Sequence, residues 1–177
     1  MRLRLSLLDL TPTVWRRLLV PGQVTLSKLH VMIQAAMGWE DYHLHAFEID
    51  GERYGASDPE EDDEDVIDEG TAVLSDVASG QARFFYEYDF GDFWRHEVVV
   101  ESVDPVPMAL KFAVCVDGQR ACPPEDCGGT SGYRDLLESI GSPGQNTEIG
   151  CVDWAGRPFD PDGFDLSIIN AALQRVR

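Results

Sequence analysis

Short segments in which apolar and polar residues alternate recur along this chain and constrain its fold more than any other feature. Apolar residues occupy alternate positions in Leu3–Leu8 and His43–Ile49, and further strand candidates are Val14–Val20, Arg83–Asp89 and Phe93–Val103. Side chains on a β-strand point alternately to its two faces, so a period of two is typical of strands with one buried face. We therefore expect a sheet with one side against a core.

Turn signals connect these segments into antiparallel pairs. Asp50-Gly51 is a strong two-residue hairpin signal because both positions of that turn need positive φ. Gly91 lies between two of the strand candidates, and Asp117-Gly118 predicts a third hairpin between Lys111–Val116 and Gln119–Ala121. The chain is expected to form a mostly antiparallel sheet.

Helical periodicity predicts about three helices. The first has an N-cap at Thr25 or Ser27 and ends at Gly38, the second covers Gly132–Ile140, and the third follows Asp165. Thr71–Val77 is expected to be a short helical or turn segment, and Trp154–Phe159 a short strand or loop. Without regular βαβ alternation, the pattern favours an α+β fold. We expect residues 1–177 to form a single domain, with the helices packed against a twisted, roll-like sheet.

Composition excludes several classes of protein. The net charge of −18 opposes a phosphate backbone, so direct nucleic-acid binding is not expected. Half of that charge comes from an acidic segment at residues 58–70, interpreted as a solvated surface loop or as a site for a metal ion or cationic partner. No run of roughly 20 apolar residues suits a membrane span, so we expect a cytoplasmic protein. Four cysteines are too few for a disulfide scaffold, which leaves thiols or metal ligands.

Two dense stretches hold the candidate functional residues. Tyr86–His96 combines aromatic, acidic and imidazole side chains around one glycine, and Pro123–Asp126 places two carboxylates on a rigid Pro-Pro turn. The alternative interpretation of the first stretch is a tight hairpin turn whose aromatics are divided between core and surface. The candidate cluster from both stretches is Asp89, Asp92, Trp94, His96, Glu125 and Asp126.

Imidazoles and thiols suggest a divalent metal site. On a strand, His43 and His45 would point to the same face, where His96 or a carboxylate from a neighbouring strand could join them. The alternative is that they are half-buried residues hydrogen-bonded to backbone and acidic neighbours. Cys115, Cys122 and Cys127 are spaced C-x6-C-x4-C, with His or Cys151 as a fourth zinc ligand. Because this is not the usual C-x2-C spacing, buried thiols are the competing interpretation.

Several long motifs resemble one family. These motifs are Trp15–Arg17, Thr25–Gln34, Met37–Trp39, His43–Phe47, Tyr86–His96, Arg120–Gly129, Gly132-Tyr133, Trp154 and Phe159–Pro161. They resemble the plasmid pRiA open-reading-frame-three family over nearly the whole chain. The resemblance implies a single α+β, roll-like domain found on plasmids and chromosomes, with no established biochemical role. A resolvase role is not expected, because the chain is acidic and has no basic DNA-binding tail.

Two functional hypotheses follow. The first is a non-enzymatic binding or accessory module whose aromatic and acidic turns contact a protein partner or a small cationic ligand. The second is a metal-dependent, hydrolytic enzyme that holds an ion with carboxylates and imidazoles. Convergence of these side chains in one cleft would favour a metal ion, since metal ligands lie about 2 to 2.6 Å from a common point.

Overall fold

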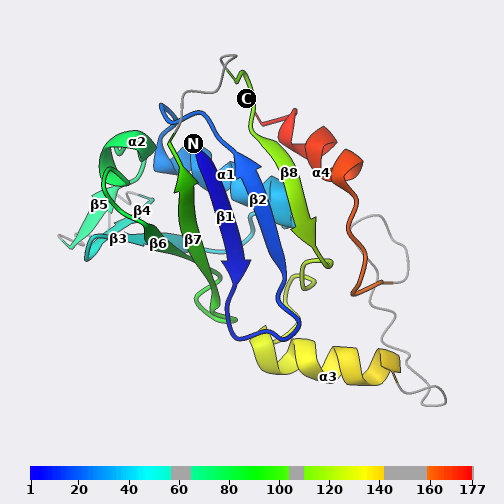
Figure 1. Ribbon diagram of the computed structural model, residues 1–177. Helices are drawn as coiled ribbons and strands as arrows, with labels where there is room; N and C mark the ends of the chain where they lie inside the picture. The colour runs from blue at the N-terminus through cyan, green and yellow to red at the C-terminus, as the bar shows by residue number, and fades with distance from the viewer. Residues whose placement is uncertain (57–64, 104–109, 142–158, 177) are drawn as a thin grey trace.

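One eight-stranded sheet organises the molecule in the computed structural model, which describes residues 1–56, 65–103, 110–141 and 159–176 (Figure 1). The strand order is β5-β4-β3-β6-β7-β1-β2-β8. The strands are β1 (Arg2–Leu7), β2 (Trp15–Leu19), β3 (His45–Ile49), β4 (Glu52–Gly55), β5 (Val66–Asp68), β6 (Arg83–Tyr88), β7 (Trp94–Ser102) and β8 (Val114–Gln119). Every pairing is antiparallel except that of β4 with β5, so the expected α+β class with a mostly antiparallel sheet is confirmed.

Four helices accompany the sheet in the described residues: α1 (Leu26–Met37), α2 (Leu74–Val77), α3 (Gly129–Gly141) and α4 (Leu166–Leu173). In Figure 1, α1 crosses behind the central strands. The terminal helix α4 contacts α1 and β8, while α3 extends away from one end of the sheet. None of these helices has the length and apolar character needed to span a bilayer.

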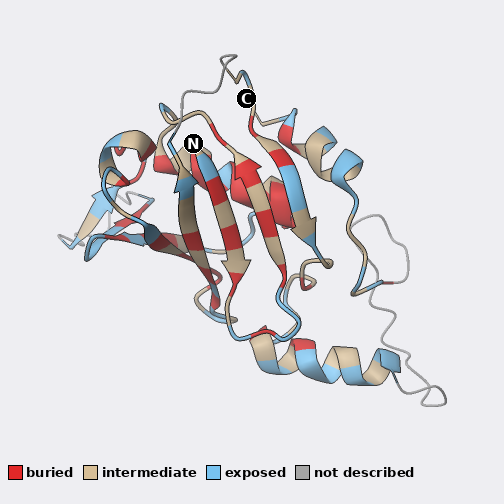
Figure 2. Cartoon of the chain, in the orientation of Figure 1, coloured by how far each residue is buried: buried red, intermediate tan, exposed pale blue. Residues whose placement is uncertain are grey.

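The core lies between the sheet and α1. Alternation in β1 buries Leu3, Leu5 and Leu7, while α1 contributes Leu29 and Ile33 from its apolar stripe. Figure 2 shows the corresponding bands of buried residues along the strands and on α1. The period of two in the strands and the helical period in α1 therefore meet in one apolar layer.

The ends of α1 agree with the sequence signals. Thr25 is the N-cap and its hydroxyl accepts a hydrogen bond from the Lys28 backbone N–H. Gly38 ends the helix in the left-handed region, with φ of 95°. The hairpin at Asp50-Gly51 is also present, joining β3 to β4 with positive φ at both residues. These local signals are confirmed.

The hairpin expected at Asp117-Gly118 is wrong. Both residues lie inside β8, which continues to Gln119 and pairs along its length with β2. Register shifts by one residue between the pairs Arg17–Asp117 and Leu18–Cys115, so the strand has a bulge at this point. Gly118 allows the ring of Phe164 to pack closely against β8, because a Cβ at this position would lie 2.6 Å from that ring. Packing, and not a turn, explains this glycine.

Other boundaries differ from the sequence-based expectations. Helix α3 begins at Gly129, three residues before the expected start, and His43 lies outside β3, which begins at His45. Residues 66–68 of the acidic segment form β5, and Glu69 is buried beside β3. Residues 58–64 and 154–158 lie outside the described residues.

Candidate metal-binding site

Three chain segments meet beside the end of β6. They are the loop that follows α1, the turn between β6 and β7, and the Pro123–Gly128 segment that precedes α3. Trp39 joins the first segment to the third, because its buried indole Nε1 donates a hydrogen bond to the Pro123 carbonyl at 3.0 Å. The Glu40 backbone N–H donates to Glu125 Oε1 at 2.9 Å. Residues far apart in the sequence are thus held side by side.

The turn between β6 and β7 fixes Asp89. Its Oδ1 accepts hydrogen bonds from the backbone N–H groups of Gly91 at 2.9 Å and Asp92 at 3.3 Å, and its own N–H donates to the Leu44 carbonyl. Asp89 has φ of 58°, in the left-handed region that aspartate tolerates better than most residues. Because Oδ1 is occupied by the turn, Oδ2 is left to face the neighbouring loop.

The segment before α3 is fixed against the same turn. Asp92 Oδ2 accepts a hydrogen bond from the Gly128 N–H at 3.1 Å. Gly129 has φ of 66°, and a Cβ there would lie 2.7 Å from the Asp92 carbonyl oxygen, so only glycine fits without displacement. This contact places Asp126, also at positive φ, opposite Asp89.

His43 lies between these two carboxylates. Its Nε2 is 3.1 Å from Asp126 Oδ1 and 3.7 Å from Asp89 Oδ2, and one potential ligand atom from each of the three residues lies within 4.8 Å of the other two. That nitrogen is shielded from solvent yet makes no hydrogen bond of normal geometry. We call His43, Asp89 and Asp126 the His43 cluster. The described residues place two carboxylates near the buried Nε2 of His43 but give this nitrogen no hydrogen bond of normal geometry.

Glu125 borders the His43 cluster. Its carboxylate accepts hydrogen bonds from the Tyr88 hydroxyl and from the Glu40 N–H. Partial burial raises the pKa of Glu125, although both hydrogen bonds act in the opposite direction. This carboxyl group therefore retains its proton to a higher pH than an exposed glutamate does.

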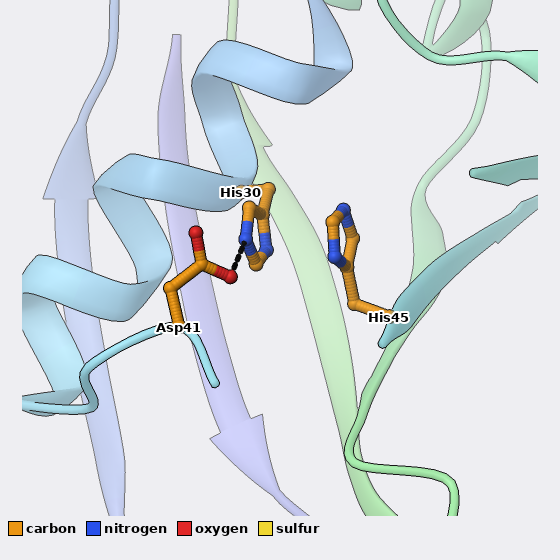
Figure 3. A group of neighbouring side chains, drawn as sticks. All are labelled: His30, Asp41 and His45. Atoms are coloured by element: carbon orange, nitrogen blue, oxygen red, sulfur yellow. Dashed lines mark hydrogen bonds and ion pairs between the residues drawn. The ribbon is translucent and has the colours of Figure 1, made fainter. Parts of the chain in front are cut away.

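A second group, the His30 cluster, consists of His30, Asp41 and His45 (Figure 3). The imidazoles of His30, on α1, and His45, on β3, are stacked with centroids 3.4 Å apart and planes 2° apart. His45 Nε2 is 2.8 Å from Oε2 of the buried Glu69. Because the lone pairs of an imidazole lie in its plane, parallel stacked rings are poorly arranged to direct both toward one ion.

Hydrogen bonds around His30 form a closed circuit. Gln34 Nε2 donates to the Tyr86 hydroxyl, which donates to His30 Nδ1 at 2.8 Å; His30 Nε2 donates to Asp41 Oδ1 at 2.7 Å; and the Asp41 N–H donates to Gln34 Oε1. The circuit assigns the His30 proton to Nε2. Both ring nitrogens are satisfied without a metal ion. Sequence analysis missed His30 and Asp41; polar residues at i and i+4 beside the apolar stripe of α1, His30 and Gln34, were the available signal.

Trp94 and His96 of the expected cluster lie in the core and belong to neither group of candidate ligands. Both are fully buried on β7, and His96 packs against Trp39 and Tyr86. Burial lowers the pKa of His96 to about 3, although the neighbouring backbone of Tyr86 and Trp94 acts in the opposite direction. Neither ring nitrogen makes a hydrogen bond of normal geometry. This histidine is a neutral core residue.

The expected cysteine ligands do not converge in the described residues. Cys115 is buried in β8 with its thiol donating to the Asp117 carbonyl, whereas Cys122 and Cys127 lie in the segment that leads to α3. Burial raises the pKa of the Cys115 and Cys122 thiols. The candidate ligand groups in the described ranges contain no cysteine, and Cys151 lies outside those ranges.

Comparison with known proteins identifies relatives over almost the entire chain. Residues 1–168 match the family described as Plasmid pRiA4b ORF-3-like protein. The chain is 33% identical over 174 residues to the uncharacterized protein y4hQ of Sinorhizobium fredii, a match covering 97% of this chain and 89% of the relative. It is also similar to the crystal structure of a protein of unknown function, MM3350 from Methanosarcina mazei Go1, with a TM-score of 0.82, 38% identity and 94% of each chain covered.

Proposed function

The chain belongs to the plasmid pRiA4b ORF-3-like family, and we propose that it is a binding module that holds a divalent metal ion with the His43 cluster. One observation carries the proposal. His43 Nε2 is buried, makes no hydrogen bond of normal geometry and lies 3.1 and 3.7 Å from the carboxylates of Asp126 and Asp89. A cation that accepts one nitrogen and two oxygen ligands would satisfy all three groups.

The spacing of the ligand atoms supports this proposal. Ligands about 2.1 Å from a tetrahedral zinc ion are separated from one another by about 3.4 Å. The His43 nitrogen is 3.1 and 3.7 Å from its two carboxylate oxygens, on either side of that value. Imidazole with carboxylate suits zinc, manganese or iron(II).

The surroundings of the His43 cluster support a prearranged site. Two backbone N–H groups orient Asp89, and the contact of Asp92 with Gly128 fixes the segment that carries Asp126. Outer hydrogen bonds of this kind orient metal ligands and raise metal affinity. The side chain of Asp126 is 72% exposed, which gives an ion access from solvent.

The surface around the cluster favours a partner that also contacts apolar side chains. Tyr42, Leu44 and Phe93 are 68%, 68% and 61% exposed. Tyr42 and Leu44 flank His43 in sequence, and the Phe93 N–H donates to the carbonyl of Asp89. In the non-enzymatic function that we propose, a protein partner would cover these side chains beside the bound ion.

Metal-dependent hydrolysis is a second candidate function, favoured by Glu125. Three protein ligands would leave a position for water on a zinc ion. A neighbouring carboxyl group of raised pKa can serve as a general acid or base. Hydrolysis of activated esters by zinc-loaded protein, lost in Glu125→Gln, would support this function; no turnover above that of free zinc would contradict it.

The metal site is tested by elemental analysis of untagged protein purified without chelator, together with zinc titration calorimetry. We expect nearly one ion per chain in the wild type, and loss of binding in Asp126→Asn. Asp162→Asn is the matched control, since the side chain of Asp162 is 78% exposed and pairs with Arg120. His30→Gln should retain the ion. A metal-free, folded wild-type protein that does not bind zinc would overturn the proposal, as would an ion lost in His30→Gln but retained in Asp126→Asn.

A further inference from the structure

A cavity of about 920 Å³ lies between the end of α1, the Ala121–Glu125 segment and α4, and Tyr42 and Glu125, which adjoin the His43 cluster, are part of its lining. Its volume is within the range of roughly 300–1,000 Å³ that is typical of small-molecule sites. Apolar and aromatic residues dominate its lining, among them Met37, Trp39, Phe159 and Phe164. None of the three residues of the His43 cluster lines it.

Arg16 is the buried charged group in this lining. The residue is only 2% exposed, and its guanidinium donates from Nε to the Ala36 carbonyl and from Nη1 to the carbonyls of Trp15 and Gln119. A guanidinium has five N–H donors, so these three bonds leave the two N–H groups of Nη2. In the described structure Nη2 makes no hydrogen bond, and it is not one of the unpaired atoms that are fully shielded from solvent.

The charge of Arg16 also has no carboxylate partner. Arg16 forms none of the ion pairs among the described residues. Backbone carbonyls offset part of its positive charge, and one of them, that of Ala36, lies in the last turn of α1. Burial lowers the pKa of Arg16, and the thiols of Cys122 and Cys115 oppose this decrease. A buried cation that lacks a counter-charge is costly.

Aromatic packing holds the guanidinium at the cavity. Its Cζ lies 5.1 Å from the ring centroid of Phe164, within the range of a cation–π contact. Phe164 can reach this position because position 118 on β8 is glycine. The indole of Trp39 forms another part of the lining and is fixed by its hydrogen bond to Pro123.

We propose that this cavity binds a small organic monocarboxylate, whose oxygens accept hydrogen bonds from Arg16 Nη2 and whose apolar body packs against Trp39 and Phe164. The ligand supplies the missing counter-charge. The lining also includes the acidic residues Glu40, Glu125, Asp160 and Asp165 and a second cation, the exposed Arg175, so a second negative charge on the ligand would meet net repulsion and weaken binding. This inference does not depend on the proposed metal site.

The test compares three probes of similar shape: 3-phenylpropionate, its neutral amide and the dianion phenylmalonate. Binding is followed by the indole N–H resonance of Trp39 in proton–nitrogen NMR spectra, assigned with Trp39→Phe. We expect a saturable shift with 3-phenylpropionate and affinity lower by about tenfold or more for the amide, since a charge-assisted hydrogen bond is lost. Phenylmalonate should bind more weakly than the monocarboxylate.

Three variants complete the test. Arg16→Met should abolish preference for the carboxylate over the amide, whereas Arg17→Met, which removes the neighbouring surface arginine of β2, should not. If Arg16→Met does not fold, Ala171→Trp decides, because this exposed residue lines the cavity and an indole there would block the probe. No shift of Trp39 at millimolar 3-phenylpropionate, equal affinity for the amide, or unchanged binding in Ala171→Trp would overturn the proposal.

Discussion

His30 and His45 stack face to face, with ring centroids 3.4 Å apart, and a ring nitrogen of each imidazole contacts its own carboxylate. Asp41 pairs with His30 and Glu69 pairs with His45. Burial is the largest cause that lowers the pKa of His30 from 6.5, the nearby His45 lowers it further, and Asp41 and Glu69 oppose the decrease. The pair therefore favours a neutral His30, and protonation of both rings would place two cations in contact.

The stack predicts opposite effects for two substitutions. His45→Gln removes the neighbouring imidazole and should raise the pKa of His30, whereas Glu69→Gln removes an acidic neighbour and should lower it. The pKa is measured by NMR titration of the His30 ring proton. Shifts of the same sign in both variants would contradict this account of the stack.

Acid sensitivity of the fold should depend on His96. Its folded-state pKa is about 3, below the value of 6.5 for an unfolded chain. The unfolded state therefore binds the proton first, and the stabilisation present above about pH 6.5 is lost as pH falls toward the folded pKa, by about 1.4 kcal/mol per pH unit.

His96→Leu should remove this contribution. We expect its free energy of unfolding at pH 7 to stay within about 1 kcal/mol of the wild-type value, because both ring nitrogens lack hydrogen bonds of normal geometry. Between pH 6.5 and 4, urea denaturation should show wild type losing more stability than the variant. Parallel pH profiles would mean that His96 takes up its proton in the folded protein at the same pH as in the unfolded chain, and would refute the lowered pKa.

The circuit around His30 predicts that one buried hydroxyl matters more than another. Tyr86→Phe leaves Gln34 Nε2 and His30 Nδ1 without their partner, at a cost of about 1–3 kcal/mol. Tyr133→Phe is the comparison, since its buried hydroxyl lies beside Arg120 but makes no hydrogen bond of normal geometry, and its removal should cost less than the loss of the Tyr86 hydroxyl. Equal losses of unfolding free energy in the two variants would show that the circuit contributes nothing specific.

Local elements could be predicted from the sequence because their signals act over a few residues. The Thr25 cap, the Gly38 terminus and the Asp50-Gly51 turn all depend on neighbouring residues. Asp117-Gly118 has the same letters as a hairpin, but pairing with β2 and contact with Phe164 decided its conformation. Tertiary contacts override turn propensity where a strand already has a partner.

For the same reason, the candidate site could be predicted only in part from the sequence. Asp89, Asp126 and His43 each attracted attention from local composition, but their convergence depends on Asp92 binding Gly128 and on Trp39 binding Pro123, contacts between residues 36 and 84 positions apart. Alternation alone also placed His43 and His45 on one face, whereas His43 precedes β3 and each joins a different cluster. Long-range packing selected the ligands, and no local pattern contains that information.

The last prediction concerns Gly129, which holds the segment of Asp126 against the turn of Asp92. Gly129→Ala adds a Cβ that would lie 2.7 Å from the Asp92 carbonyl, in a residue with φ of 66°. Gly80→Ala is the matched control because Gly80 has φ of 79° but open space around its Cβ position. Left-handed backbone alone costs about 1–2 kcal/mol, and the contact should add at least about 1 kcal/mol more in Gly129→Ala. In urea denaturation the difference between the two variants therefore isolates the contact. Zinc affinity should fall in Gly129→Ala only, because Asp126 moves away from His43; an equal loss of stability and unchanged zinc binding in both variants would show that this contact does not position the carboxylate.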